Sequence, residues 1–468
     1  MEIEKGAKRI IVAIALLQAA LTVAIFALPR VVETLPGQYY VRLQNHPLTA
    51  GVIELVTTPL PTALPVAAST TGRAAPASLP EIPGLDSSVA LAPTATATLQ
   101  PIATHTPAEP EAAAGESETA ATAMPLATPS PTASPTPIPL PPQANLEGLE
   151  VVKQGFNNCG PANLTIILNY WGEGTTQEEA AARLKPNRED RNVSPWQIEE
   201  YVNELTGLRA IARSGGDMEM IKRFVAAGIP VVIEKGYEPN STEGWYGHYL
   251  TVYGYDDAKQ EIYTRDTNSG PFDGSPRVDN YDDFAHWWQQ FNYTFYVVYQ
   301  PAQEALVQAI IPDPLLEDRS MWEYTSELAA AEVEADPNNV FALFNLGVSQ
   351  TRLGELTGDA AYYERGATAF DQARAIGLPP RTLYYEHRPF MAYWKVGRLD
   401  DVLALADAML ATTGGRYVEE IYWFKGHALA AQGNLIGARD AYASALEVNP
   451  TFHPAQQSLD WVNSLLNG

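Results

Sequence analysis

Two different spacings of hydrophobic residues follow one another along the middle of the chain. Up to about residue 227, apolar positions recur every three or four residues, as in amphipathic helices. From residue 229 onward, short runs of β-branched and aromatic residues replace that spacing, as in strands. Helices followed by a sheet indicate an α+β domain, which we place at residues 146–301. The helices are predicted at 161–171, 176–184, 195–205 and 218–227, and the strands at 229–233, 248–255, 261–265 and 295–299.

From residue 318 to residue 468 the pattern is helical throughout and repeats itself. In its last unit, small and aromatic residues fall at the spacings of a tetratricopeptide repeat, a helix–turn–helix of about 34 residues. An earlier unit matches with an insertion near 357–363, and a degenerate middle unit keeps its turn glycine, Gly397. We therefore expect an all-α tetratricopeptide-repeat domain, with a generic helical bundle as the alternative. The positions in the last unit are Tyr422, Gly426, Gly433, Ala438, Tyr442, Ala445 and Pro450.

The start of the chain has the pattern of a membrane anchor. Residues 10–28 form an uncharged run that is long enough to span a bilayer, and basic residues precede it within residues 1–9. Basic residues ahead of such a run place the N-terminus in the cytoplasm and the rest of the chain outside. We expect an uncleaved single-pass anchor in the cell membrane, with a cleaved signal peptide as the alternative.

Residues 29–145 are rich in proline, alanine, threonine and serine and have no lasting periodicity. Such a segment buries too little apolar surface to offset the entropy that ordering would cost. Its proline density favours extended stretches. We therefore predict a disordered stalk between the membrane and the folded domains.

Composition narrows the classes of function. The formal net charge of −25 argues against nucleic acid as a partner. A single cysteine excludes an intrachain disulfide and a cysteine-based zinc cluster. The stretch 266–270 begins like a calcium loop but lacks the glycine at its sixth position and a clear glutamate at its twelfth. We expect neither a metal nor a cofactor.

The one cysteine, Cys159, stands directly before Gly160 and Pro161. Proline suits the first turn of a helix, so Cys159 is predicted at a helix N-terminus, where the helix dipole and free N–H groups favour a thiolate. Gln154 lies five residues upstream and can direct its amide to the same place. The alternative is that Cys159 is a small buried hydrophobic residue.

A base for this cysteine is predicted from the strands. His248 opens one strand and Asp266 ends the next, and a tight hairpin would set His248 opposite Asp266 or Thr267. Asp266 would then orient His248, whose other ring nitrogen faces Cys159, in the order of a catalytic triad. Alternatively, His248 is a half-exposed strand residue and Asp266 a turn former. The other histidine of this domain, His286, is expected to pack among aromatic residues.

At these residues the chain resembles a known family. The stretches Q-G-F-N-N-C-G-P-A, S-P-W-Q-I-E-E-Y, A-A-G-I-P-V-V-I and G-H-Y-L-T-V-Y-G-Y-D, followed by Asp266, look like the bacteriocin-processing-type cysteine peptidases. More closely, they resemble the broad group of peptidase C thirty-nine-like domains on the papain-like fold. The resemblance covers about residues 146–301 and implies an α+β papain-like domain. Thr267 stands where the family usually has proline.

The resemblance also implies roles for four residues. Cys159 would be the nucleophile, His248 the general base and Asp266 its orienter, while Gln154 would help to form the oxyanion hole. The family's true peptidases lie on the cytoplasmic side of ABC exporters and cut after a double glycine. Because this chain has neither a transporter nor that topology, the double-glycine substrate does not carry over.

These observations lead to three hypotheses about function. The first is a membrane-tethered extracytoplasmic cysteine peptidase that hydrolyses peptide bonds in a peptide or protein substrate, with repeats that recruit a protein or peptide partner. The second is a catalytically inactive papain-like domain in a repeat-based binding scaffold. The third is hydrolysis of peptide cross-links in the cell wall.

Overall fold

The computed structural model describes residues 140–239, 244–412 and 414–468, together with residues 63–66 and scattered positions before residue 54. Among these described residues, no helix has both the length and the apolar character needed to cross a membrane. Most of the predicted anchor at 10–28 and most of the predicted stalk at 29–145 lie outside the described residues.

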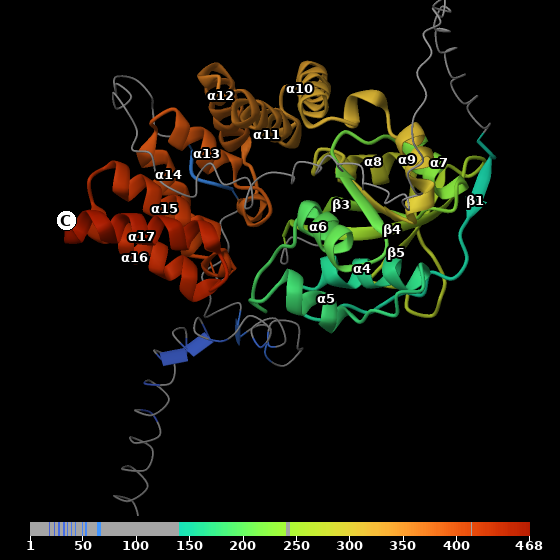
Figure 1. The fold of residues 1–468 in the computed structure, drawn as a ribbon, viewed down its shortest axis with the longest axis horizontal. Coiled ribbons are helices and arrows are strands. Elements are labelled where there is room, and N and C mark those ends of the chain that lie inside the picture. Colours follow the sequence, from blue (N-terminus) through green and yellow to red (C-terminus); the bar gives the residue numbers. More distant parts are fainter. Residues whose placement is uncertain are drawn as a thin grey trace, which may run out of the picture.

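In the described part of the chain, one antiparallel sheet of seven strands forms the centre of the α+β region (Figure 1). Its order is β2-β7-β3-β4-β5-β6, and β1 lies beside the end of β4. The strands are β1 Gln143–Asn145, β2 Arg209–Arg213, β3 Val231–Tyr237, β4 Tyr246–Asp256, β5 Glu261–Asp266, β6 Arg277–Asn280 and β7 Phe295–Tyr299.

Helices pack on both faces of this sheet and make two hydrophobic cores. On β3, Val232 contributes to the core under α4, whereas Val231 and Ile233 contribute to the core under α7. Because side chains alternate along a strand, a stretch covered on both faces is apolar at successive positions, as at Val231, Val232 and Ile233. The helices are α4 Cys159–Tyr170, α5 Gln177–Leu184, α6 Pro195–Leu205, α7 Met218–Ala226, α8 Tyr281–Gln289 and α9 Glu304–Ile310.

The helix starts follow the capping signals in the sequence. Thr176 caps α5 with a capping box that it shares with Glu179. Ser194 caps α6, and Pro195 is its first residue, as the Ser-Pro pair predicted. The four predicted helices and four predicted strands are thus confirmed, with ends that differ by a few residues. The strands β1, β2 and β6, which have five residues or fewer, were not predicted.

Two described pieces of the predicted stalk are ordered. Residues 143–145 pair with β4, so the folded region begins before the expected boundary at residue 146. Farther upstream, Leu64 is buried and its backbone N–H donates to the carbonyl of Leu378 at 2.9 Å. Arg374 Nε donates to the carbonyl of Pro65 at 2.7 Å. The prediction of a wholly disordered stalk therefore does not hold at these two places.

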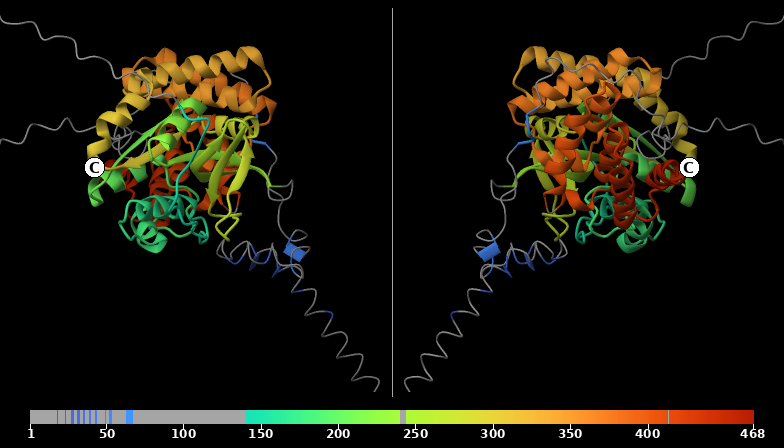
Figure 2. Two further views of the ribbon diagram at one scale, coloured as in Figure 1. Left: turned by 90° about the vertical axis from the view of Figure 1, so that its right-hand side faces the viewer. Right: turned by 90° about the vertical axis from the view of Figure 1, so that its left-hand side faces the viewer.

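From residue 318 onward the described part of the chain is helical. Consecutive helices pack side by side, from α10 and α11 near α8 to α17, where the chain ends (Figures 1 and 2). The helices are α10 Asp318–Ala335, α11 Val340–Thr357, α12 Ala360–Ile376, α13 Arg388–Lys395, α14 Leu399–Leu410, α15 Glu419–Ala431, α16 Leu435–Val448 and α17 His453–Asn467.

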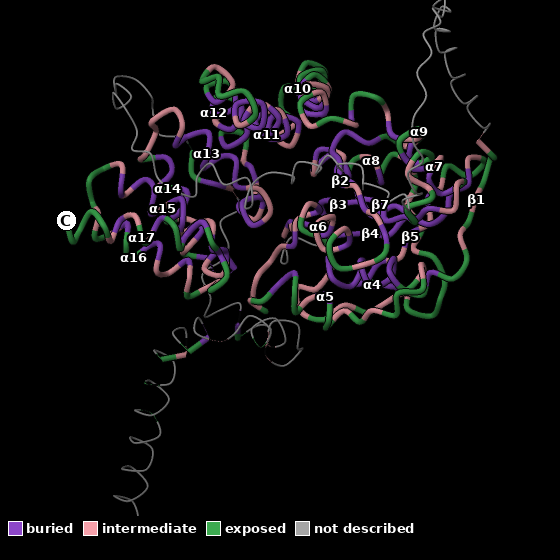
Figure 3. The backbone as a smooth tube through the Cα atoms, in the orientation of Figure 1, coloured by how far each residue is buried: buried purple, intermediate pink, exposed green. Residues whose placement is uncertain are grey.

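These helices are joined to the α+β region through a shared core. Buried residues of α10 and α11 belong to the same hydrophobic cluster as those of α7 and α8, and Figure 3 shows the buried stretches of the helices next to one another. On α11, Asn345 Nδ2 donates to the carbonyl of Gln289 at 2.6 Å. The two regions therefore bury part of each other's surface.

In two pairs of neighbouring helices, close contact depends on a glycine. At Gly426 of α15, a Cβ atom would overlap the ring of Tyr442 on α16. Gly347 of α11 has the same relation to Phe370 on α12. A glycine in the first helix therefore makes room for an aromatic ring of the second in both pairs.

We predict that Gly426→Ala destabilises the helical region. Overpacking costs about 1–3 kcal/mol, while the higher helix propensity of alanine returns at most about 1 kcal/mol. The free energy of unfolding, measured by denaturant titration, should fall by up to about 2 kcal/mol. In a Tyr442→Leu background the same substitution should cost less, because the ring is gone. An equal loss of unfolding free energy in both backgrounds would show that the Tyr442 ring is not the reason why glycine is needed at position 426.

Candidate active site

Cys159 is the first residue of α4, and Asn158 is the N-cap residue. The thiol side chain is partly exposed. Close packing holds this end of the helix in place, because a Cβ on Gly160 would lie 3.2 Å from Val193 and 3.6 Å from Tyr249. The helix N-terminus therefore presents the sulfur beside β4, in a field that favours the thiolate.

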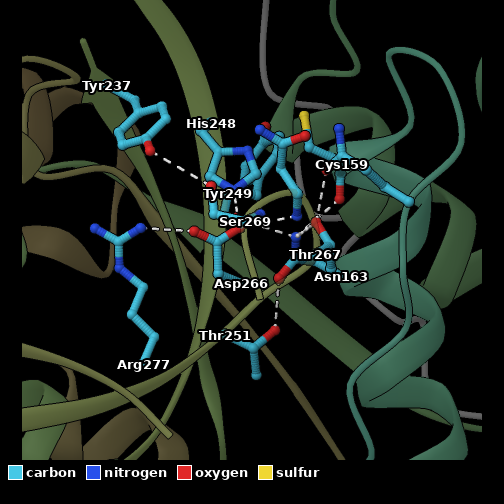
Figure 4. Close-up of polar contacts among 12 residues, drawn as sticks. Cys159, Asn163, Tyr237, His248, Tyr249, Thr251, Asp266, Thr267, Ser269 and Arg277 are labelled. Atoms are coloured by element: carbon cyan, nitrogen blue, oxygen red, sulfur yellow. Dashed lines mark hydrogen bonds and ion pairs between the residues drawn. The ribbon is translucent and has the colours of Figure 1, made fainter. Parts of the chain in front are cut away.

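His248 lies on β4 between this thiol and a carboxylate (Figure 4). Its Nε2 is 2.9 Å from Asp266 Oδ1, and both side chains are almost completely buried. The His248 ring also lies near enough to Cys159 to lower the pKa of the thiol. Because Nε2 is engaged by Asp266, Nδ1 is the ring nitrogen that faces the sulfur. The structure thus brings Cys159, His248 and Asp266 together.

The strand register differs by two residues from a pairing of His248 with Asp266, and by one from a pairing of His248 with Thr267. Asp266 pairs with Leu250 across the hairpin. The turn, which closes at the Asp256–Glu261 pair, causes the shift, and a bulge between Val252 and Gly254 reduces it by one residue. Because side chains alternate with a period of two, a shift of two residues keeps Asp266 on the same face as His248, at a diagonal position.

Asp266 has further partners that the sequence did not reveal. Its Oδ1 accepts the backbone N–H groups of Asn268 at 2.8 Å and Ser269 at 2.9 Å. Its Oδ2 lies 2.6 Å from Nη1 of Arg277, which comes from β6. This ion pair was missed because β6 is short and polar, with no pattern that marks it as a strand. These partners hold the carboxylate in position and favour its ionised form.

Each of the three groups favours the charged form of its neighbour. Burial alone raises the pKa of the Cys159 thiol, but the hydrogen bond and charge of His248 outweigh it and set the pKa below its ordinary value. Burial likewise disfavours the imidazolium, yet hydrogen bonds to Asp266 and Cys159 raise the pKa of His248 to about 9. Asp266 is buried, but the hydrogen bond to His248 holds its pKa well below the usual range. A thiolate–imidazolium pair is favoured near neutral pH.

Gln154 reaches the site through Thr267. Thr267 Oγ1 donates to Gln154 Oε1 at 2.7 Å, and the backbone N–H of Gln154 donates to the carbonyl of Thr267 at 2.8 Å. Asn163 Nδ2 donates in turn to Thr267 Oγ1 at 3.3 Å and to the carbonyl of Cys159 at 2.9 Å. Since Oε1 of Gln154 is engaged, its Nε2 remains as the donor of that amide. Thr267, which departs from the family pattern, therefore orients Gln154.

The helical region contributes a residue next to His248. Tyr385, which follows a short turn of 3-10 helix at Pro380–Tyr384, directs its hydroxyl to the carbonyl of Gly247 at 3.4 Å. Asn192 Nδ2 donates to the carbonyl of Tyr385 at 3.5 Å. His286 lies elsewhere, on α8 against Trp287, as expected from its aromatic neighbours. Within the described residues, no group of three His, Cys, Asp or Glu side chains is placed to hold a metal ion.

Comparison with known proteins shows which family part of the chain is similar to. Residues 136–296 match the Peptidase_C39 like family. No curated protein matches the chain. A C39-like peptidase from Bacillus anthracis is similar at 16% identity and a TM-score of 0.28. A double glycine motif protease from an AMS/PCAT transporter, solved with its leader peptide, is similar at 14% identity and a TM-score of 0.24. Each comparison covers 34% of this chain and 98% of the other.

We predict that Cys159 is alkylated at pH values below those that a free thiol requires. Its apparent pKa, from the pH dependence of the rate with iodoacetamide, should lie below about 8.5. Removal of the imidazole in His248→Ala should raise that pKa, because the two largest effects that oppose burial, the hydrogen bond and the charge of His248, are then lost. Intact mass reports the reaction directly, since the chain has one cysteine. His286→Ala is the matched control and should behave as wild type. An unchanged pH profile in His248→Ala would contradict the ion pair.

Proposed function

We propose that the chain is a cysteine peptidase that hydrolyses peptide bonds through Cys159, His248 and Asp266. The observation that carries the proposal is the buried hydrogen bond between His248 and Asp266 beside Cys159, whose thiol pKa the imidazole lowers. The family match over residues 136–296 supports the same class of reaction. Nucleophile, base and orienter are the three roles that a cysteine hydrolase needs.

The proposed reaction begins with attack of the Cys159 thiolate on the carbonyl carbon of the scissile peptide bond. Nε2 of Gln154 donates to the oxyanion that forms. The C–N bond then breaks, and the His248 imidazolium gives its proton to the leaving amine. Water attacks the resulting thioester while His248 accepts the water's proton. Release of the carboxylic acid product restores the thiolate and the imidazolium.

Asp266 would act on His248 and not on the substrate. Its negative charge favours the imidazolium, and its hydrogen bond to Nε2 leaves Nδ1 directed toward the sulfur. Arg277 and the two backbone N–H groups hold the carboxylate in this position. The low pKa of Asp266 means that it stays ionised throughout the reaction.

For the rest of the chain, we propose that helices α11 to α16 are tetratricopeptide repeats that recruit a protein or peptide partner. The equivalent pairs Gly347–Phe370 and Gly426–Tyr442 support a repeat, since each couples the first helix of a unit to its second. We also propose, from the sequence alone, that residues 10–28 tether the peptidase to the cell membrane on its extracytoplasmic side.

The role of Thr267 gives a test of this site. Hydrolysis of labelled casein by the purified chain should be lost in Cys159→Ala. Thr267→Val removes the hydroxyl that orients Gln154 and should lower kcat by about tenfold to hundredfold with little change in KM. Gln154→Ala should lower kcat by about 10²–10³.

The matched control is Thr267→Ser, which keeps the hydroxyl and should retain most of the activity. Rescue by serine separates orientation of Gln154 from a packing effect. Casein hydrolysis that persists in Cys159→Ala would refute the proposed function. Equal activity of Thr267→Val and wild type would refute the proposed role of Thr267 alone.

A further inference from the structure

A cavity of about 300 Å³ lies where the α+β region meets the helical region. Cys159 is not among the residues that line it. Asp190, which follows α5, contributes to one wall, and Glu419 and Glu420 at the start of α15 contribute to another. The volume is at the lower end of the range for small-ligand pockets. Aromatic rings also line the cavity, among them Trp196, Trp245 and Phe291.

Three of the carboxyl groups that line this cavity, those of Asp190, Glu419 and Glu420, repel one another. Burial, and next the charge of Glu419, raises the pKa of Asp190 to about 8. Burial, and next the charge of Glu420, raises the pKa of Glu419 to about 8. Burial, and next the charge of Asp190, raises the pKa of Glu420 to about 8. Each group is therefore less acidic than in water, first because it is buried and next because one of the other two is near.

Two buried polar atoms at the cavity have no hydrogen-bond partner. Glu419 Oε1 accepts from Asn449 Nδ2, but Glu419 Oε2 makes no hydrogen bond although the residue is only 6% exposed. His387 Nε2 is also without a hydrogen bond, and that residue is 7% exposed. Burial lowers the pKa of His387 to about 4, so the ring is neutral. Buried acceptors of this kind normally have a donor.

The nearby cations already have partners. Lys185 Nζ donates to the backbone carbonyls of Phe156, Asn157, Arg188 and Asp190, and its charge only partly offsets the rise in the pKa of Asp190. Arg388 forms ion pairs with Glu355 and Glu386. Glu419 and Glu420 also lie in the first turn of α15, where the helix dipole favours acidic residues. That preference explains neither Asp190, which comes from another region of the chain, nor the unpaired oxygen of Glu419.

We propose that this cavity binds one cationic group, the ammonium of lysine or the guanidinium of arginine, carried by a bound peptide. Negative carboxylates and aromatic faces both attract such a group. A lysine ammonium would donate to the unpaired Oε2 of Glu419 and relieve the repulsion among the three carboxylates. The chain would then select peptides that carry a basic residue.

The cavity is close enough to Cys159 to take part in substrate selection. Glu234 and Tyr385 line it. Glu234 pairs with Tyr249, the residue after His248, and the hydroxyl of Tyr385 meets the carbonyl of Gly247, the residue before it. This step rests on the proposed peptidase function, whereas binding of the cation does not.

Calorimetry on the full chain carrying Cys159→Ala tests binding without any turnover. The probes are Nα-acetyl-lysine methylamide and its norleucine counterpart, which lacks the charge. The Kd of the lysine probe should be lower by about tenfold to hundredfold, as expected for a charged hydrogen bond. Its affinity should rise from pH 6 to pH 9, since the three carboxyl groups with raised pKa must lose protons to attract the cation.

Glu419→Gln should abolish the lysine preference and leave norleucine binding unchanged, because glutamine keeps the acceptor for Asn449 but not the charge. The matched control is Asp282→Asn, which removes an exposed carboxylate from the first turn of α8. Its Kd values should equal those of the parent. The proposal is overturned if neither probe binds, if both bind equally, or if the preference survives Glu419→Gln. None of these results depends on whether the wild-type chain hydrolyses peptides.

Discussion

The hydrogen bond between His248 and Asp266 is the interaction on which the account of the site depends. It joins two neighbouring strands, and it settles which ring nitrogen faces the Cys159 sulfur. The carboxylate itself is held by Arg277 and by two backbone N–H groups, so its charge persists despite burial. That charge favours the imidazolium, and the imidazolium favours the thiolate at the start of α4. A single buried carboxylate thereby sets the protonation of both partners.

Local patterns were enough to predict the elements that carry the site. Two helix starts were predicted from Thr176 and from the pair Ser194 and Pro195. A helix that begins near Cys159 was predicted from Pro161. The prediction placed Asp266 on the same face of the sheet as His248, which requires only that the register be shifted by an even number of residues. Its partner across the hairpin was predicted incorrectly, because that partner depends on a bulge. Local sequence does not show where a strand pair accommodates an extra residue.

Features that depend on distant contacts could not be predicted in the same way. Arg277 acquires its role only when the short strand β6 pairs with β5. Tyr385 reaches the carbonyl of Gly247 because the helical region folds against the sheet. The acidic cavity likewise combines Asp190 with residues more than two hundred positions later in the chain. The family match covers residues 136–296 and therefore does not extend to these helices.

The protonation state of His248 tests the central claim most directly. In a chain with isotope-labelled histidine, NMR follows the seven imidazole rings through a pH titration, and loss of one signal in His248→Ala assigns the ring of interest. The account predicts that His248 titrates at about 9 in the wild type and at a lower pH in Cys159→Ala, which lacks the thiolate. A midpoint near the ordinary value of about 6.5 in both proteins would contradict it.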